Sequence, residues 1–177
     1  MIHVVSLETH EPELVAAVTH ALFTAYGVGT ELTAERSIPE TVVEGGAVDA
    51  DKLMAAVESL KTFADDKILY LVRRPFRARP SPIGPIPTHG LADYGKDRAV
   101  MSAALVTQGA TTPEAQAVRL AKLAVHTVGH LFDLHHCVDA RCAMAPPWSV
   151  NFVKGQTVEL CSFCRDKSER RMKNTAA

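Results

Sequence analysis

The sequence predicts an α/β domain in which helices pack on a β-sheet. Its 177 residues are enough for one domain with a hydrophobic core and few for two. Hydrophobic residues make up 47% of the chain and charged residues 22%, as in ordinary globular proteins. Up to residue 72, short apolar segments alternate with amphipathic ones. This strand–helix alternation favours a layer of helices on a sheet.

Four segments have the character of buried strands, because they are short and rich in apolar and β-branched residues. They are residues 2–7 (IHVVSL), a weaker segment at 31–35, residues 67–72 (KILYLV) and residues 98–106 (RAVMSAALV). Gly45 and Gly46 interrupt the chain after the second of them.

Three segments repeat apolar residues at the helical period. The first runs from Pro12 to Tyr26, where Gly27 ends it, and the second runs from Asp49 or Asp51 to about residue 64. The third begins at Thr111 or Thr112; Thr111 and Glu114 have capping-box spacing, and Pro113 suits the first turn. The expected buried positions are Val15, Val18, Leu22 and Ala25; Leu53, Val57, Leu60 and Ala64; and Val118, Ala121, Val125, Val128 and Phe132.

Two segments lack these patterns. Residues 73–90 contain five prolines and begin with four arginines, which predicts an irregular loop. The loop is either a solvated surface segment or a basic lip for acidic partners or nucleic acid. Residues 165–177 are strongly charged, and we expect one or two helical turns there, followed by a frayed tail.

Charge and hydropathy limit the partners. The net charge of −1 provides no general attraction to nucleic acid or membranes, and no apolar run reaches the roughly 18 residues of a membrane span. The first residues lack a basic segment followed by an apolar one, so no signal peptide is recognisable and we expect a cytoplasmic protein. In a reducing compartment, clustered cysteines bind metal more often than they form disulfides.

Histidines within residues 126–136 form a candidate metal site. His126 and His130 are four residues apart, so their imidazoles lie one helical turn apart on the same face. His136 joins them only if the helix ends and the chain turns back near Asp133. Three neutral imidazoles with an open fourth position are typical of a catalytic zinc site.

Four cysteines form a second candidate site. Cys137 and Cys142 are one pair, and Cys161 and Cys164 are another, eighteen residues further on. This pattern is close to that of a zinc ribbon, in which four thiolates hold a structural zinc ion. Two disulfides, buried free thiols and an iron–sulfur cluster are the alternatives. A zinc ion here would connect the segment that carries Met144 and Pro146-Pro147 to the C-terminal segment.

The segment HTVGHLFDLHHC, residues 126–137, resembles the HExxHxxGxxHC signature of archaemetzincins, zinc peptidases of the metzincin clan. The resemblance continues through Cys142-Ala-Met144 and, sixteen residues later, Cys161-Ser-Phe-Cys164. Residues 90–106 (GLADYGKDRAVMSAALV) resemble the family's segment before and through the strand that edges the active-site cleft.

The resemblance implies a single metzincin-like domain over residues 1–177. Its sheet would be twisted and mostly parallel, with an antiparallel edge strand at the cleft. Residues 1–134 would hold the sheet and end with the active-site helix, and residues 135–177 would form the zinc-stapled C-terminal part. His126, His130 and His136 match the ligands of the catalytic zinc, the four cysteines match those of a structural zinc, and Met144 matches the Met-turn residue.

Two residues depart from the family signature. Thr127 occupies the position of the glutamate that acts as general base, and its hydroxyl has no useful basicity near pH 7. Asp133 occupies the position of the turn glycine, where a positive φ would cost about 1 kcal/mol and loosen the turn before His136. Rescue of the base by Asp133, and competition of His135 for the metal, are the further possibilities.

We therefore expect a zinc-binding homologue with little or no proteolysis, which binds a peptide or small-protein ligand in the cleft by pairing with the strand RAVMSAALV. One alternative is an active zinc peptidase of narrow range that uses another base. The other is a zinc-stabilised module that binds nucleic acid through the arginine loop and basic tail, which the near-neutral charge disfavours.

Overall fold

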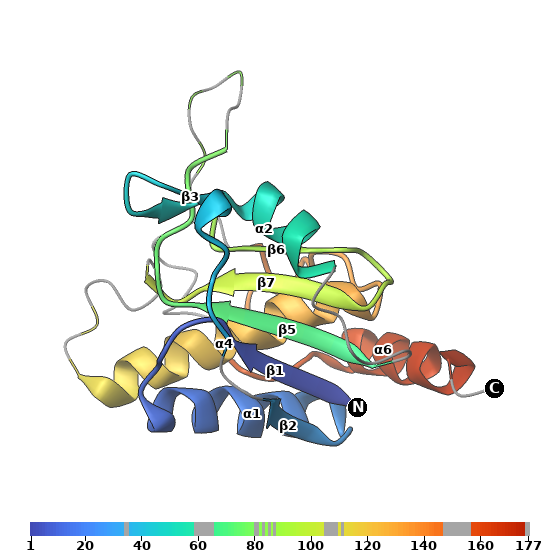
Figure 1. Cartoon of the computed structure of the whole chain (residues 1–177). Helices are drawn as coiled ribbons and strands as arrows, with labels where there is room; N and C mark the ends of the chain where they lie inside the picture. The colour runs from blue at the N-terminus through green and yellow to red at the C-terminus, as the bar shows by residue number, and fades with distance from the viewer. Residues whose placement is uncertain are drawn as a thin grey trace.

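A five-stranded sheet with helices on both faces forms the body of the molecule (Figure 1). The structure is a computed structural model. It describes the chain except for residues 34–35, 59–65, 80–81, 83, 85, 87, 105–109, 111, 147–156 and 176–177. The strands are β1 (Ile2–Ser6), β2 (Thr30–Thr33), β5 (Lys67–Val72), β6 (Gly90–Ala92) and β7 (Arg98–Ser102). Their order across the sheet is β2-β1-β5-β7-β6.

The sheet is parallel except at one edge. Strands β2, β1, β5 and β7 run parallel, and β6 pairs antiparallel with β7, Gly90 opposite Met101 and Ala92 opposite Ala99. The predicted α/β class, with its antiparallel edge strand, is therefore confirmed. The assignment of RAVMSAALV to the edge is wrong, because β7 bonds to β5 on one side and β6 on the other. The free edge on that side is the short strand β6.

The helices divide between the two faces of the sheet (Figure 1). Helices α1 (Pro12–Tyr26) and α4 (Pro113–Leu131) pack together on one face, and α6 (Ser162–Thr175) lies beside α1. Helix α2 (Ala50–Glu58) covers β6 and β7 on the opposite face, near the 3-10 turn η1 (Glu40–Val42). A small hairpin, β3 (Val43–Glu44) and β4 (Ala47–Val48), turns at Gly45 and Gly46, both with positive φ.

The helix predictions were accurate where the signals were local. Helix α1 runs from Pro12 to Tyr26 as predicted, and Gly27 ends it at φ 66°. Asp49 caps α2 by accepting a bond from the Lys52 amide. The cap of α4 is Thr112, one of the two predicted residues, which accepts from the Ala115 amide; Thr111 lies outside the described residues. Of the predicted buried positions, Leu60 and Ala64 lie outside the described residues, as do the strand positions 105–106.

Two predictions were wrong, one about the burial of a residue in α4 and one about the length of the C-terminal helix. Val118 is 50% exposed, whereas the other predicted positions of α4 are buried. Val118 lies on the first turns of α4, where residues 113–119 are exposed or half-buried and the buried positions begin only at Leu120. The C-terminal segment is a 14-residue helix, α6, rather than one or two turns, and it begins directly after Cys161.

The arginine-rich loop is bound to the rest of the chain. Arg74 pairs with Glu8, Arg77 with Glu44 and Arg79 with Asp51. Isolated bridges join Phe76 to Val48 and Arg79 to Ile86, so the described part of the loop is irregular but held in place. Among the described residues, no helix is long and apolar enough to cross a membrane.

Candidate metal centres

The second half of α4 carries two buried histidines on adjacent turns. His126 is 3% exposed and His130 is 8% exposed. Their rings meet edge to face with centroids 4.8 Å apart. This half of α4 is packed between α1 and the sheet, yet four of its buried residues, Lys122, His126, Thr127 and His130, are polar. Burial of two imidazoles side by side therefore needs a chemical reason.

Backbone carbonyls orient both rings. The Nδ1 atom of His126 lies 3.0 Å from the Ala143 carbonyl oxygen, and Nδ1 of His130 lies 2.7 Å from that of Leu134. A carbonyl oxygen only accepts, so each Nδ1 carries the proton and each neutral ring presents an Nε2 lone pair. The two Nε2 atoms face each other at 3.2 Å. Two lone pairs in this position repel each other unless a cation lies between them.

Burial keeps these rings neutral. Burial, followed by repulsion from His130, lowers the pKa of His126 to about 3, and burial lowers the pKa of His130 to about 4. The pKa of His136 is also lowered, chiefly by burial. All three imidazoles are thus unprotonated at neutral pH, which is the form that coordinates metal ions.

A tight turn brings His136 back to the helical pair. Asp133 has φ 60°, the Asp133 amide donates to the His130 carbonyl, and the Leu134 amide donates to the Gly129 carbonyl. This is the Schellman arrangement that ends many helices, usually with glycine at the left-handed position. The His136 ring stacks on His126 with centroids 5.2 Å apart and lies 5.3 Å from His130.

The three histidines predicted from the sequence therefore converge, with one ligand atom from each within 4.8 Å of the others. His135 is not in this cluster; its exposed ring stacks on Tyr94. The Asp133 carboxylate binds Arg171, and this guanidinium holds the pKa of Asp133 below its usual value. Asp133 is therefore a weak base whose carboxylate is engaged with α6, which argues against the rescue hypothesis.

Thr127 lies against the edge strand β6 at Gly90. It is 3% exposed. A Cβ atom added to Gly90 would lie 3.1 Å from the Thr127 hydroxyl oxygen and 3.1 Å from the Val100 carbonyl. Glycine at position 90 thus lets β6 approach the helix at the residue next to His126.

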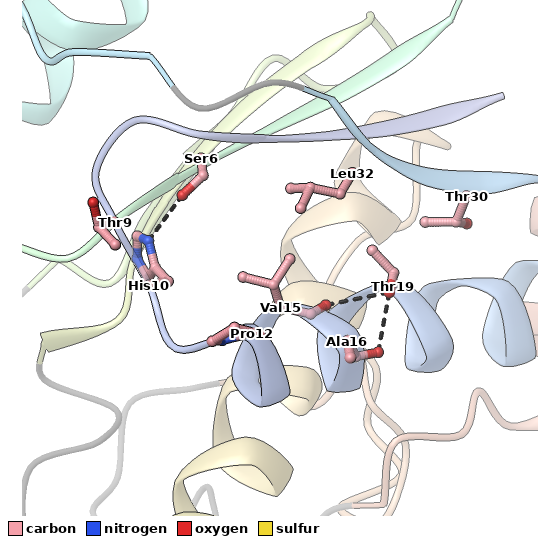
Figure 2. A pocket seen from close by; sticks show the side chains of 9 residues that line it. All are labelled: Ser6, Thr9, His10, Pro12, Val15, Ala16, Thr19, Thr30 and Leu32. Atoms are coloured by element: carbon pink, nitrogen blue, oxygen red, sulfur yellow. Dashed lines mark hydrogen bonds between the residues drawn. The ribbon is translucent and has the colours of Figure 1, made fainter.

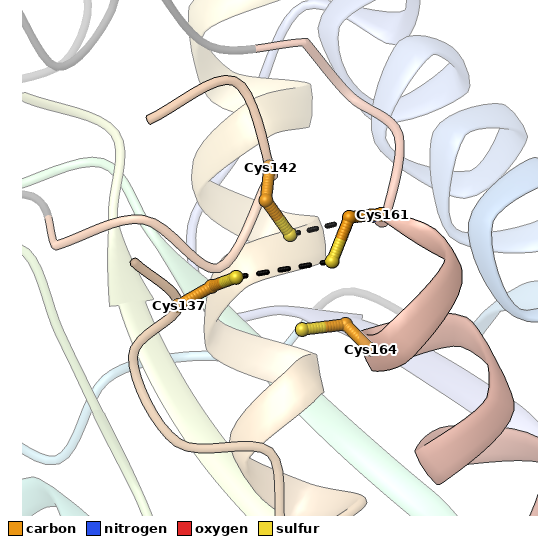
Figure 3. Close-up of side chains that lie close together, drawn as sticks. All are labelled: Cys137, Cys142, Cys161 and Cys164. Carbon is orange, nitrogen blue, oxygen red and sulfur yellow. Dashed lines mark hydrogen bonds between the residues drawn. The ribbon is translucent and has the colours of Figure 1, made fainter. Parts of the chain in front are cut away.

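The four cysteines converge in the same way from three segments (Figure 3). Their sulfur atoms all lie within 4.8 Å of one another, and the Sγ atoms of Cys137 and Cys161 are 3.8 Å apart. All four are free thiols, so the alternative of two disulfides is not what the structure shows. The Met144 and Cys161 amides both donate to Cys142 Sγ. Burial raises the pKa values of Cys142 and Cys164, so a cation is needed to hold all four as thiolates.

The cysteine cluster directly supports the histidine cluster. Cys142 precedes Ala143, whose carbonyl orients His126, and Cys137 follows His136. The Cys137 amide also donates to the Met144 carbonyl. The adjacency of His136 and Cys137 is visible in the sequence, whereas the link through Ala143 is not, because a hydrogen bond between residues 17 positions apart has no sequence pattern.

Met144 packs against α4 at Gly129. Met144 is fully buried, and a Cβ atom added to Gly129 would lie 2.3 Å from its sulfur and 2.9 Å from the Tyr26 hydroxyl. The Tyr26 hydroxyl donates to the Val125 carbonyl at 2.6 Å and so ties α1 to α4. Gly129 is therefore the position at which Met144 and α1 reach the backbone of α4.

We expect Gly129→Ala to destabilise the protein. Overpacking costs about 1–3 kcal/mol, against a gain of about 1 kcal/mol in helix propensity. The net loss should lower Tm by roughly 2–6 °C in a chain of this size. Thermal unfolding measures it, and Gly29→Ala is the control, because an added Cβ there meets only the Met1 side chain at 3.7 Å. Equal Tm values for the two variants would contradict the packing described.

The hairpin between β6 and β7 supplies an aromatic ring that no sequence motif indicates. The Tyr94 ring lies 4.5 Å from the His130 ring and 5.4 Å from the His135 ring, between centroids. The Gly95 amide donates to the His130 carbonyl at 2.9 Å. A lone tyrosine in a polar turn gives no local signal for such a contact.

A cavity of about 540 Å³ lies apart from both clusters, between β1, β2 and the first turns of α1 (Figure 2). Ser6, Thr9 and His10 line its polar side. The His10 Nδ1 atom contacts Ser6 Oγ and the Glu8 carbonyl, whereas its Nε2 is buried and has no partner among the described residues. None of the predicted site residues lines this cavity.

Comparisons with known proteins agree with this arrangement. The model of Peptidase family M54 matches residues 90–170. Archaemetzincin from Methanopyrus kandleri superposes with a TM-score of 0.80 at 23% identity, over 97% of this chain and 94% of that one. The archaemetzincin from Archaeoglobus fulgidus complexed with malonate superposes with a TM-score of 0.75 at 21% identity, over 94% of this chain and 98% of that one. A zinc-dependent peptidase from Methanocorpusculum labreanum superposes with a TM-score of 0.75 at 18% identity, over 95% of this chain and 100% of that one. A search of curated proteins finds no match.

The chain has the fold of the archaemetzincins, with two side-chain clusters that could each hold a metal ion. The resemblance to archaemetzincins is confirmed: residues 90–170 match Peptidase family M54, and the chain has the archaemetzincin fold.

Both clusters fit zinc by the chemistry of their donors. Two nitrogens that share a tetrahedral zinc ion at 2.0–2.1 Å lie about 3.3 Å apart, close to the 3.2 Å between the Nε2 atoms of His126 and His130. Three imidazoles leave one position open, as in catalytic sites, whereas four thiolates close a structural site.

Proposed function

We propose that this protein binds zinc at both clusters and has lost most or all of its peptidase activity. The observation that carries the proposal is the buried Thr127 beside a complete three-histidine cluster. His126, His130 and His136 would hold the catalytic-type ion, and Cys137, Cys142, Cys161 and Cys164 the structural one. Met144, packed on Gly129 beneath the histidines, would serve as the Met-turn residue.

The chemistry of the site lacks one component. Zinc held by three imidazoles would acidify a water molecule and polarise a peptide carbonyl. The chain must still accept a proton from that water and deliver it to the leaving amine. The Thr127 hydroxyl has no basicity near pH 7, and Asp133 is bound to Arg171. Loss of a general base typically lowers the rate about 10²–10⁴-fold.

The proposed ligand is an extended peptide or a segment of a small protein. Strand β6 is the free edge of the sheet on the side of α4, and it lies above Thr127. An extended chain can pair with such an edge through main-chain hydrogen bonds. Because the edge is β6 and not β7, we now place this pairing at residues 90–92.

Metal analysis tests the proposal. We expect two zinc ions per chain in the unmodified protein, one in His130→Ala, and proteolysis of unfolded protein substrates near background in both. His135→Ala is the matched control and should keep two ions, because His135 lies outside the cluster. One ion in the unmodified protein and in His130→Ala alike would show that the histidine site is not used. Robust cleavage that a chelator abolishes would favour the active peptidase with another base.

A further inference from the structure

The turn after α4 is held by charges from the C-terminal helix. Arg171 Nη2 lies 2.5 Å from Asp133 Oδ2, and Lys167 Nζ lies 2.6 Å from the Asp133 carbonyl oxygen and 3.8 Å from Oδ2. Lys167 and Arg171 are four residues apart, so α6 presents both cations on one face. They meet the single described residue other than glycine that has a positive φ.

The ion pair between Arg171 and Asp133 offsets the strain of a positive φ, which a glycine at position 133 would not have. Glycine adopts a positive φ without strain, whereas an L side chain does so at a cost. Asp133 instead offers a carboxylate that Arg171 can bind, and an ion pair of this kind shifts a conformational equilibrium by a few-fold. The opposite side of the turn is also covered, since an added Cβ on Gly95 would lie 3.6 Å from Asp133 Cβ.

The turn at Asp133 connects the second and third histidines of the cluster. Asp133 lies three residues after His130 and three before His136, so its conformation decides whether His136 reaches the helical pair. Helix α6 starts at the cysteine cluster and ends beyond Arg171. The helix therefore spans from the one cluster to the turn that completes the other.

We propose that Arg171 and Lys167 are positioning residues that hold Asp133 in its left-handed conformation and thereby place the His136 imidazole in the metal cluster. The proposal rests on the proposed function in one respect, because it assumes that the histidine cluster is the site whose geometry matters.

Two readouts test it. Hydrogen exchange at the Leu134 amide, which donates to the Gly129 carbonyl, measures the turn without any metal. Competition with a chelator, using cobalt(II) because its absorption distinguishes imidazole from thiolate ligands, measures the affinity of the histidine site. In Arg171→Met we expect protection of Leu134 and cobalt affinity to fall about 3–5-fold. Arg171→Lys should recover much of both.

The controls separate positioning from a general loss of charge. Arg170→Met removes the same charge from an exposed neighbour and should change neither readout by more than about twofold. In Asp133→Gly, which adopts the turn without the ion pair, Arg171→Met should have no further effect. Equal effects of the Arg170 and Arg171 variants, or an undiminished effect in the Asp133→Gly background, would overturn the proposal. If no variant binds cobalt at the histidines, the proposed function fails. The exchange data alone then decide whether Arg171 and Lys167 hold the turn at Asp133.

Discussion

Thr127→Glu should create zinc-dependent peptidase activity about 10²–10⁴-fold above that of the unmodified protein, because it restores the missing proton acceptor. The three histidines, their orienting carbonyls and the edge strand are already in place. Gly90 has no side chain over position 127, so only the backbone of β6 borders the new carboxylate. Release of fluorescence from a quenched protein substrate, with and without a chelator, measures the gain.

Thr127→Gln is the matched control for this variant. The amide has nearly the shape of the glutamate but cannot take up a proton near neutral pH, so its activity should stay at the level of the unmodified protein. The double variant Thr127→Glu, His130→Ala should also be inactive. Equal activity in the Gln and Glu variants, or no gain in a Glu variant that keeps two zinc ions, would refute the assignment of Thr127 to the general-base position.

Cys161→Ala should have the largest effect on stability. A structural zinc site contributes on the order of 10 kcal/mol, which is comparable with the whole stability of a typical domain. Loss of one thiolate opens the site, releases the N-terminus of α6 and removes support from Ala143 and Cys137 beside the histidines. We expect loss of both metal ions, a fall in Tm of well over 10 °C, and rapid proteolysis of residues 137–177.

Ser162→Ala, next to Cys161 and exposed, is the control and should behave like the unmodified protein. His130→Ala should lose one ion with a much smaller change in Tm, because a zinc site with three protein ligands cross-links fewer segments of the chain than a site with four. If Cys161→Ala kept its Tm within 2–3 °C, the cysteine cluster would have no structural role in this chain.

The resemblance over residues 126–164 led to the right fold even though two residues of the signature differ. Asp133 was expected to loosen the turn before His136. The turn does have the positive φ that the argument required, but it is closed by both Schellman hydrogen bonds and by Arg171. The error came from treating the strain at Asp133 as a local matter, when a helix 38 residues further along the chain supplies the compensating charge.

The sequence by itself determined what depends on short spacings. The i,i+4 histidines, the paired cysteines, the proline and glycine limits of α1 and the apolar strands are all patterns within one element, so local geometry is enough to interpret them. The tertiary structure alone decided which strand is the edge, that Tyr94 stacks on His130, that Ala143 orients His126 and that α6 clamps Asp133. The last three contacts join residues 36, 17 and 38 positions apart, and their partners are chosen by the packing of whole elements, which no local pattern records.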